Sequence, residues 1–197
     1  MDGIKIIDEK YIYLGSYPQD GTEKEPIKWR IIKNEDGVLT VITDKIMFNM
    51  DFDTWYSNYK NSTVRKYINN NFIPFAFTQE EQSYILDTEL EEVTDKVFIP
   101  SRADIKGVCR DELVRKVTPY ARSKKASAYP DDDTYEYVSG SLLHNGWYWL
   151  RTPYTPPYDP KRSNEVYYID YTGYISARVV YNGEDIGVVL MMRVKTK

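Results

Sequence analysis

Strand-forming runs lie at both ends of this sequence, and helix-forming segments lie between them. Apolar and charged side chains alternate over Ile27–Lys33, the period of two that is expected when a strand buries one face. The turn-forming segment Asn34–Gly37 separates this run from the β-branched run Val38–Thr43. We therefore predict a hairpin with a four-residue loop, together with a further short strand at Tyr11–Leu14.

Helix start signals mark the middle of the chain. Ser62 is placed to cap a helix over Thr63–Asn71, and Thr78–Glu81 has the pattern of a capping box. The charged stretch 101–114 is expected to form one or two short helices. The dipeptide Thr118-Pro119 has the pattern of an N-cap followed by proline at the first helical position.

Strand-forming runs return in the last third of the chain, at Trp147–Arg151, Val166–Ile169, Tyr174–Ala177 and Val188–Val194. No repeat at a fixed period and no clear linker divides the sequence. We therefore predict that residues 1–197 form a single α+β domain. Its sheet is expected to be twisted and mostly antiparallel, with helices contributed by the middle of the chain.

A single Cys and a single His among 197 residues exclude several kinds of site. One Cys rules out an internal disulfide framework and a Cys-based zinc site, and one His leaves no set of His ligands for a metal. The formal net charge of -4 argues against a general nucleic-acid binder, which carries a basic excess. We expect no cofactor and no bound metal.

The hydropathy of the chain indicates a soluble protein. No apolar run approaches the roughly 20 residues that span a bilayer. The first ten residues lack the basic and apolar regions of a signal peptide. We expect no membrane span and a cytoplasmic location unless a leader has been removed, and we leave the oligomeric state open.

Few residues suggest catalysis or metal binding. Cys109 and His144 would supply a nucleophile and a base if the fold brought them together. Asp131–Asp133, followed by Glu136, is the densest carboxylate cluster, and hard oxygen ligands suit calcium. Neighbouring side chains of an extended segment point to alternate sides, so a solvated surface loop is the stronger interpretation.

Charge is segregated along the middle of the sequence. The stretch Glu80–Asp95 holds seven acidic residues and no basic one, whereas Arg102–Lys125 holds eight basic residues against three acidic ones. Two solvated faces of complementary charge would explain this pattern. A basic binding patch is the alternative, with contacts that weaken as salt rises.

Tyrosine is over-represented, and its distribution is uneven. The chain has 19 Tyr, of which 12 lie between Tyr120 and Tyr181. Tyrosine suits half-buried strand positions, but it also supplies rigid contact area with a hydrogen-bonding tip. Tyr154 and Tyr158 fall in a Pro-rich polar segment, residues 152–164, which we interpret as a loop. Of the neighbours Tyr167 and Tyr168, one is expected to be exposed, because successive strand residues face opposite sides.

Four segments resemble the motifs of a bacterial domain family of unknown function. These motifs have the forms FGxYPQ, PIxWxVL, SxxRxWLNxxFxxxAF and WWLRSP, and the matching segments are Leu14–Gln19, Pro26–Ile32, Ser62–Phe77 and Trp147–Pro153. The family usually closes with GVRPAL, where this chain has Gly187–Met192 without the Arg-Pro pair.

That family is similar to the C-type-lectin-like group, which includes formylglycine-generating enzymes and diversified ligand-binding proteins. The resemblance implies an α+β fold whose ends meet in one sheet, with Trp149 and Leu150 in the core and Arg151 as one partner of a buried pair. The resemblance does not imply any of the enzymatic or calcium-binding activities known in that group. Formylglycine generation needs two Cys, the iron-dependent sulfoxide synthases need several His, and the Glu-Pro-Asn or Gln-Pro-Asp of calcium lectins does not occur here.

We therefore predict a non-catalytic ligand-binding module that recognises a glycan or a protein surface. Its site is expected on the Tyr-rich surface near the C-terminus, at Tyr154, Tyr158, Arg162, Asn164, Tyr168, Tyr171, Arg178 and Tyr181. Two alternatives stay open. One is a divergent enzyme that uses Cys109 and His144 or a carboxylate pair, and the other is a phage or surface assembly protein.

Overall fold

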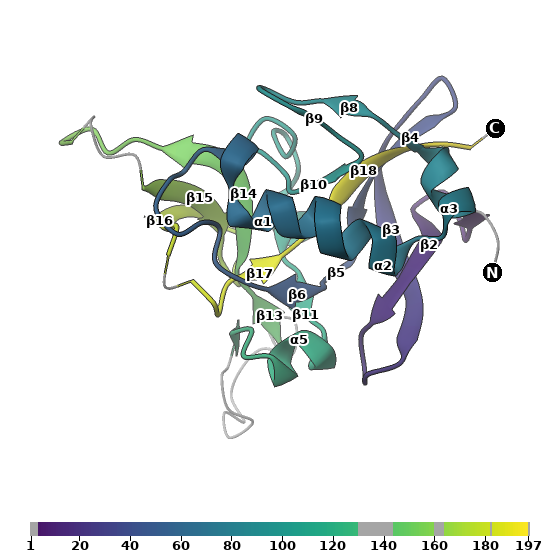
Figure 1. Cartoon of the computed structure of the whole chain (residues 1–197), viewed down its shortest axis with the longest axis horizontal. Helices are drawn as coiled ribbons and strands as arrows, with labels where there is room; N and C mark the ends of the chain where they lie inside the picture. Colours follow the sequence, from purple (N-terminus) through teal and green to yellow (C-terminus); the bar gives the residue numbers. More distant parts are fainter. Residues whose placement is uncertain (1–3, 130–143, 160–163, 182, 197) are drawn as a thin grey trace.

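The largest sheet joins strands from both halves of the chain. The computed structural model describes residues 4–129, 144–159, 164–181 and 183–196. Within these ranges the sheet has seven strands in the order β1-β2-β3-β4-β18-β10, and β7 also pairs with β18 (Figure 1). The strands are β1 (Lys5–Ile6), β2 (Tyr11–Pro18), β3 (Lys24–Glu35), β4 (Val38–Thr43), β18 (Met191–Lys195), β10 (Val97–Phe98) and β7 (Ile85–Leu86).

The hairpin between β3 and β4 closes through Asp36 and Gly37 alone. Strand pairing extends to Glu35 and Val38, so the turn has two residues and the predicted four-residue loop is wrong. The backbone angle φ is 51° at Asp36 and 79° at Gly37. Positive φ at both positions is the type I′ geometry, which Asp-Gly favours and which matches the twist of the flanking strands.

The helical segment after Ser62 is longer than predicted. The Ser62 hydroxyl accepts a hydrogen bond from the Arg65 N–H at 3.2 Å, which confirms the predicted cap. The segment continues as α1 (Thr63–Tyr67), a π turn η2 (Ile68–Phe72) and α2 (Ile73–Ala76). The wider turn lies directly before Pro74, whose ring would clash with a carbonyl of a regular helix.

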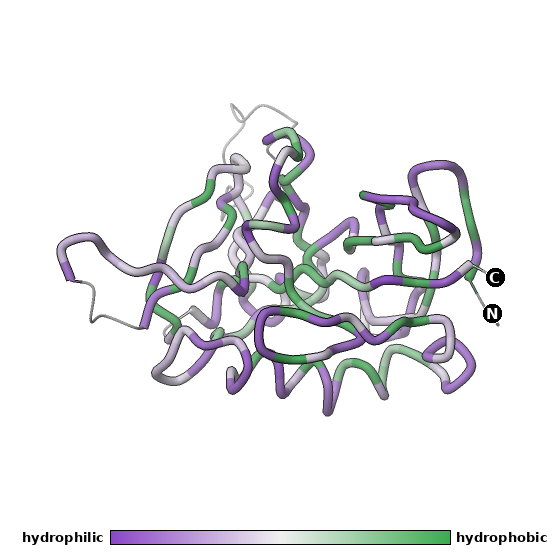
Figure 2. The backbone as a smooth tube through the Cα atoms, turned by 90° about the horizontal axis from the view of Figure 1, so that it is seen from above, coloured by the Kyte–Doolittle hydropathy of each residue, from purple (hydrophilic) through white to green (hydrophobic). Residues whose placement is uncertain are grey.

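The face that this segment buries is apolar. Val64, Ile68 and Phe72 are buried, and the Phe72 ring lies 5.1 Å from Tyr17 and 5.6 Å from Phe48 between centroids. Hydrophobic and hydrophilic residues alternate along it, as an amphipathic helix requires (Figure 2). The two views place α1 and α2 on one side of the sheets.

A second sheet holds five of the late aromatic residues, on β14 and β15. It has the order β16-β15-β14-β17-β6, formed by β16 (Ile175–Val179), β15 (Glu165–Ile169), β14 (Tyr148–Tyr154), β17 (Gly187–Val188) and β6 (Phe48–Asn49). The strand predicted over Val188–Val194 is therefore two strands, β17 and β18, in different sheets. The strand predicted to end at Arg151 continues to Tyr154.

Two smaller sheets, the 3-10 helix η1 (Tyr59–Asn61) and three short α-helices complete the described part. The sheets are β12-β13-β11-β5, formed by β12 (Ala128–Tyr129), β13 (Asn145–Gly146), β11 (Lys116–Val117) and β5 (Lys45–Ile46), and the pair β8 (Thr88–Glu89) with β9 (Thr94–Asp95). The helices are α3 (Gln79–Tyr84), α4 (Arg110–Leu113) and α5 (Pro119–Ser123).

The predicted caps of the short helices are confirmed. Thr78 and Glu81 form the capping box of α3, and the Thr118 hydroxyl accepts from the Ala121 N–H at 3.1 Å. The stretch 101–114 contains one short helix, α4, and turns, which agrees with the prediction of one or two short helices.

Two tryptophans organise the core between these layers. Trp29 and Trp149 are fully buried, and their indole N–H groups donate to the carbonyls of Leu14 at 2.8 Å and Met50 at 2.9 Å. Leu150 is fully buried as well. The core positions that the family resemblance implies, Trp149 and Leu150, are thus confirmed.

The architecture is α+β, with mostly antiparallel sheets and few helices. The C-terminal strand β18 pairs with β4, so strands from the two ends of the chain meet in one sheet, as expected. Across the residues described, no helix combines the length and the apolar character needed to cross a membrane.

Candidate functional site

Tyr154 is a strand residue rather than a loop residue. It ends β14, pairs with Glu165 on β15, and meets the Tyr167 ring edge-on with 5.2 Å between centroids. The guanidinium of Arg102 lies 4.4 Å from the centroid of Tyr167. Packing across strands therefore accounts for Tyr154, and its interpretation as a loop residue is wrong.

Tyr167 and Tyr168 are both half-buried, so the expectation that one of them is exposed is also wrong. Tyr168 lies opposite Trp149 on β14 and opposite Ser176 on β16. Strand β15 lies between β16 and β14, so both tyrosines have neighbouring strands on either side.

Tyr171 lies in an aromatic cluster at the end of β15. Its ring stacks on Tyr129 with 4.2 Å between centroids and 15° between planes, and it meets the edge of Trp147 at 5.1 Å. The Asn145 side chain donates to the Tyr171 carbonyl at 3.2 Å. These contacts hold Tyr171 in place and leave it partly exposed.

The polar residues of the predicted site also have contacts within the chain. The Asn164 carbonyl accepts from the Val180 N–H at 2.9 Å. Arg178 forms an ion pair with Asp185 at 3.4 Å. Arg162 lies outside the described residues.

Tyr158 is the one described residue of the predicted site that is an exposed large aromatic, and Tyr181 lies beside another exposed aromatic. Tyr158 is 77% exposed. Tyr181 is half-buried, and its ring centroid lies 6.1 Å from that of Trp55. Trp55 is 66% exposed and Tyr56 is 65% exposed, and the sequence prediction missed both. The available signal was two adjacent aromatic residues in a polar segment without strand or helix periodicity.

We call the segment Asp53–Asn61 the Trp55 loop. The Asp53 N–H donates to the Val180 carbonyl at 3.2 Å, and the Gly183 N–H donates to Asp51 Oδ1 at 2.5 Å. These two bonds tie the start of the loop to the segment that follows β16. They bring Trp55 and Tyr181 together although more than a hundred residues separate them in sequence.

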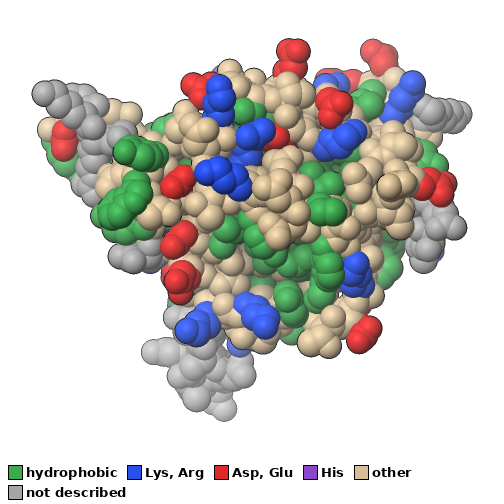
Figure 3. Space-filling model, viewed as in Figure 1, with side chains coloured by type: hydrophobic (Ala, Val, Ile, Leu, Met, Phe, Trp, Pro, Cys, Tyr) green, Lys and Arg blue, Asp and Glu red, His purple; other side chains and the backbone are tan. Residues whose placement is uncertain are grey.

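The Trp55 loop borders a wide hollow of about 500 Å³, which we call the Trp55 hollow. Its lining combines the two exposed aromatic residues with polar groups, namely Asp53, Thr54, Trp55, Tyr56, Ser57, Asn58, Asn61, Thr63 and Lys66. Hydrophobic side chains are exposed at the left of the face in Figure 3, where Figure 1 places β15, β16 and the chain that precedes α1.

A smaller hollow of about 180 Å³ adjoins it, because Asn58 lines both. We call it the Arg151 hollow. Its other lining residues come from the Trp55 loop, from the turn between β8 and β9, and from the end of β14, and they are Tyr59, Lys60, Glu91, Glu92, Val93, Arg151, Thr152 and Pro153.

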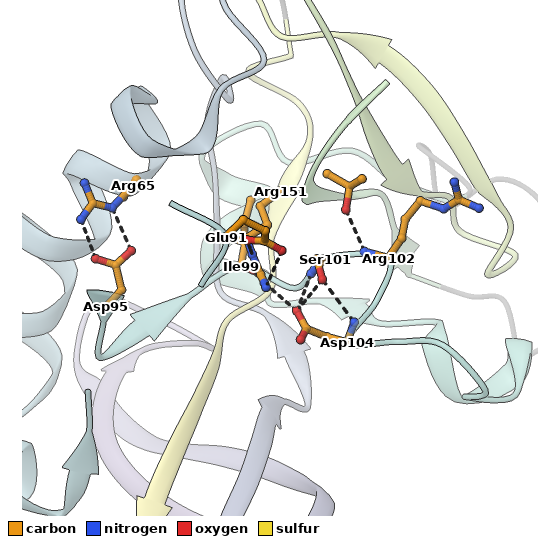
Figure 4. Close-up of polar contacts among 9 residues, drawn as sticks. Arg65, Glu91, Asp95, Ile99, Ser101, Arg102, Asp104 and Arg151 are labelled. Atoms are coloured by element: carbon orange, nitrogen blue, oxygen red, sulfur yellow. Dashed lines mark hydrogen bonds and ion pairs between the residues drawn. The ribbon is translucent and has the colours of Figure 1, made fainter. Parts of the chain in front are cut away.

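Arg151 organises the charged side of this hollow (Figure 4). Its guanidinium donates to Glu91 Oε2 at 2.9 Å, to Asp104 Oδ2 at 2.6 Å and to the Ile99 carbonyl at 2.8 Å. Burial by itself lowers the pKa of Arg151, but the bonds to the two carboxylates outweigh it and the pKa is raised. Arg151 is therefore a buried, ion-paired arginine, as the family resemblance implies, with a half-buried partner in Asp104 and a mostly exposed one in Glu91.

A second arginine fixes the start of α1 beside the same region. Arg65 binds both carboxylate oxygens of Asp95, with Nε–Oδ2 and Nη2–Oδ1 distances of 2.8 Å (Figure 4). Asp95 is buried, and a two-bond pair of this kind is strong and directional. It connects the Trp55 loop, through α1, to β9.

Two buried oxygen atoms of the hollow-lining residues, Asn58 Oδ1 and the Tyr59 hydroxyl, form no hydrogen bond of standard geometry within the described chain. The Tyr59 oxygen still interacts with the Ile99 backbone. The amide nitrogen of Asn58 donates to Glu92 Oε2 at 2.8 Å, which sets the orientation of the amide. Burial, reinforced by the negative charge of Asp95, raises the pKa of Tyr59 above its ordinary value, although the interaction with Ile99 by itself lowers it.

The residues considered for catalysis lie apart from these hollows. Cys109 is exposed at the N-cap of α4, and the His144 ring nitrogen Nδ1 lies 3.1 Å from Arg122. Asp131–Asp133 and Glu136 lie outside the described residues. In the part of the chain that is described, no group of three Asp, Glu, His or Cys side chains is close enough together to hold a metal ion.

The basic residues of the stretch 102–125 have different surroundings in the structure. Arg115 is buried and donates to the Thr43 carbonyl at 3.1 Å, and its burial lowers its pKa. Arg102 lies over Tyr167, and Arg110 lies over Tyr174 with 4.6 Å to the ring centroid. Buried Arg115 is not available to a ligand, and Arg102 and Arg110 contact tyrosine rings within the chain, so these three do not form one free basic surface.

The described chain is thus an α+β domain with two adjoining hollows beside a tryptophan-bearing loop. It belongs to a family described as a domain of unknown function (DUF6273), whose model matches residues 36–194. The match confirms the coarser part of the resemblance, a domain family of unknown function. Neither the curated proteins nor the solved structures contain a match to the chain.

Proposed function

We propose that this protein is a non-catalytic ligand-binding module that binds a glycan through the Trp55 loop and Tyr181. The observation that carries the proposal is the exposure of Trp55 and Tyr56, at 66% and 65%, beside a hollow of about 500 Å³. Large aromatic side chains usually bury most of their area. Two exposed neighbours at a concave surface therefore offer apolar faces for a ligand.

The surroundings of these rings favour a sugar over a protein surface. Asn61 and Thr63 place an amide and a hydroxyl group in the same hollow. A sugar ring presents apolar C–H groups on its faces and hydroxyl groups at its rim, which match aromatic faces and polar side chains respectively. A stable protein interface needs about 1,000 Å² or more of complementary surface with several anchors.

The C-terminal part of the predicted site contributes Tyr181 and Tyr158. Tyr181 supports Trp55 from the side, with 6.1 Å between ring centroids. Tyr158 is open to solvent and supplies a further aromatic face. We also propose that the fold is C-type-lectin-like. The pairing of β18 with β4, which joins both ends of the chain in one sheet, supports this assignment.

A glycan array followed by calorimetry on the best ligand tests the proposal. Trp55→Ala and Tyr56→Ala are each expected to weaken binding by at least about tenfold, because each removes a stacking face. Tyr174→Ala is the matched control, because Tyr174 is 58% exposed and lines neither hollow. Wild-type affinity in Trp55→Ala overturns the proposed surface. If no glycan binds and a protein partner is captured in a way that depends on Trp55, the ligand of this surface is a protein and not a glycan.

A further inference from the structure

Strand β16 (Ile175–Val179) is an edge of the second sheet, because it pairs with β15 on one side and with no described strand on the other. It has five residues, whereas every other edge strand in the described part of the chain has two. Its five pairs with β15 follow one another without a register shift. A long and regular edge of this kind is a template for a further strand.

The hydrogen bonds at the two ends of this strand pair show which way its backbone groups point. In an antiparallel pair, hydrogen-bonded and non-bonded positions alternate along each strand. The Asp170 N–H donates to the Tyr174 carbonyl, and the Val180 N–H donates to the Asn164 carbonyl, both at 2.9 Å. Both bonds continue the register of β15 with β16, so the bonded positions on β16 are its even-numbered residues.

The odd-numbered residues of β16 therefore direct their N–H and C=O groups away from the sheet. These residues are Ile175, Ala177 and Val179, and their backbone groups form no hydrogen bond with any other described residue. Ile175 and Ser176 are exposed, and the other three residues of the strand are half-buried. The outward groups thus lie at an edge that solvent reaches.

Strand β16 lacks the features that protect edge strands from pairing. Natural edges usually carry a Lys, a Pro or a β-bulge. The sequence of β16 has neither Lys nor Pro, and its pairing with β15 has no bulge. Its one charged residue, Arg178, forms an ion pair with Asp185 of the same chain at 3.4 Å. Ile175, which is 40% exposed, adds apolar surface at the edge.

The strand is complementary to a second copy of itself. An antiparallel alignment centred on Ala177 places Ile175 of one copy opposite Val179 of the other, so apolar side chains meet apolar side chains. Only outward-directed residues face each other in this alignment, and the three pairs of the dimer form six backbone hydrogen bonds. Arg178 lies opposite Ser176, so no like charges oppose each other.

We propose that two copies of this protein form a symmetric dimer in which their β16 edges pair antiparallel around Ala177. The two five-stranded sheets then join in one continuous sheet, and the two-fold arrangement closes both β16 edges. The contact is small, so we expect a dimer that dissociates on dilution, with a Kd on the order of 10–100 µM. This inference goes beyond the proposed glycan binding and does not depend on it.

Sedimentation velocity from about 1 µM to about 1 mM tests the dimer, and wild type is expected to change from monomer to dimer across this range. Ala177→Pro removes an outward N–H without touching the bonds to β15, and Ile175→Lys places a charge on the same edge. Each is expected to weaken dimerisation at least about tenfold. Ile6→Lys is the matched control with wild-type dimerisation, because Ile6 is 58% exposed on the edge strand β1.

Hydrogen exchange in the wild-type protein locates the contact without any substitution. The amides of Ile175, Ala177 and Val179 are expected to exchange at least about tenfold more slowly well above the Kd than well below it. The amides of Ser176 and Arg178 are expected to change little, because they are bonded to β15 at every concentration. This alternation distinguishes strand pairing from a contact made by side chains alone.

The outcomes decide the dimer separately from glycan binding. A protein that stays monomeric across the range overturns the proposal. Wild-type dimerisation in both Ala177→Pro and Ile175→Lys overturns the β16 contact, as does exchange at the three outward amides that is independent of concentration. If Ala177→Pro does not fold, Ile175→Lys and the exchange experiment still decide. A dimer that is lost in Ile6→Lys but kept in Ile175→Lys overturns the proposal in favour of the β1 edge.

Discussion

Arg151 Nη1 lies 2.6 Å from Asp104 Oδ2, and this pair connects β14 to the segment that follows β10. The same Asp104 oxygen accepts hydrogen bonds from the N–H and the hydroxyl of Ser101, both at 2.8 Å. Arg151 also holds the Ile99 carbonyl and the Glu91 carboxylate. One arginine thus positions three stretches of chain around the Arg151 hollow.

Replacement of Arg151 by Met is expected to lower the free energy of unfolding by about 2–4 kcal/mol. The change removes a hydrogen-bond donor from the Asp104 carboxylate and from the Ile99 carbonyl. Breaking a fully buried ion pair costs about 3–5 kcal/mol. We expect a smaller loss here, because Glu91 is mostly exposed. Urea denaturation measures it. Arg110→Met is the control, since the Arg110 ion pair with Asp111 is long, at 3.9 Å, and exposed, and a loss of less than about 1 kcal/mol is expected. An equal loss in both variants would contradict the role of Arg151.

The stability of the protein is expected to fall on acidification in part through Glu91. Burial by itself raises the pKa of this carboxyl, but the hydrogen bond and charge of Arg151 outweigh it and hold the pKa below its ordinary value of 4.5. The ionised form therefore stabilises the fold fully above about pH 4.5, and this contribution is lost as the pH falls through the lower folded-state pKa. Urea midpoints measured from pH 6 to about pH 3 are expected to fall less steeply in Glu91→Gln than in wild type. Glu184→Gln, at an exposed position, is the control, and identical slopes in all three proteins would rule out the Glu91 contribution.

Gly15 is expected to tolerate no side chain. Its φ is +71°, and a Cβ atom there would lie 2.5 Å from the Phe77 ring. Its N–H also donates to Glu81 Oε1 at 3.1 Å, which joins β2 to the start of α3. Gly15→Ala is expected to cost about 2–4 kcal/mol, the sum of a left-handed backbone and an overpacked core. Gly21→Ala has open space around it and is expected to change the thermal midpoint little, so similar midpoints for both variants would refute the close contact.

Tyr154 and Tyr158 are expected to respond differently to replacement by Ala. Tyr154→Ala removes an edge-on contact with Tyr167 and is expected to cost about 1–2 kcal/mol of stability. Tyr158→Ala is expected to change the stability by less than about 0.5 kcal/mol, because Tyr158 is 77% exposed. Chemical denaturation separates the two, and glycan titration of the stable Tyr158→Ala variant shows whether this residue extends the binding surface. A stability loss in Tyr158→Ala as large as in Tyr154→Ala would mean that the loop packs on the domain.

Elements that depend on short-range chemistry were predicted well. The caps at Ser62, Thr78 and Thr118 each use a side-chain oxygen three residues before the N–H that it binds, so the sequence contains the whole interaction. The strand Val38–Thr43 was predicted with its observed bounds because β-branched residues and an adjacent turn signal define it locally.

Elements that depend on distant partners were predicted less well. Tyr154 belongs to β14 although Pro153 precedes it, and the prolines nearby suggested a loop. Pro153 pairs with Val166 on one side, while β17 pairs with β14 only at Tyr148, so the proline occupies an edge position that needs no N–H. The partner strand β15 begins only after the segment 155–164, and β17 lies further along the chain, so local pattern did not reveal the extension.

The candidate site was missed for a related reason. Adjacent Trp and Tyr are usually core residues, and their exposure here depends on the anchoring of Asp53 to Val180 and of Asp51 to Gly183. These contacts join residues far apart in the chain. Tyr181 was among the predicted candidates, but its neighbour Trp55 became visible only in the folded chain.

The position of β18 determines when this domain is able to fold during synthesis. Residues 191–195 form a central strand, with β4 along one edge and β10 and β7 along the other. Until the ribosome has released these residues, β4 on one side and β7 and β10 on the other have no strand to join them. The nascent chain therefore carries unpaired strand edges, which favour aggregation, until translation is nearly past this domain.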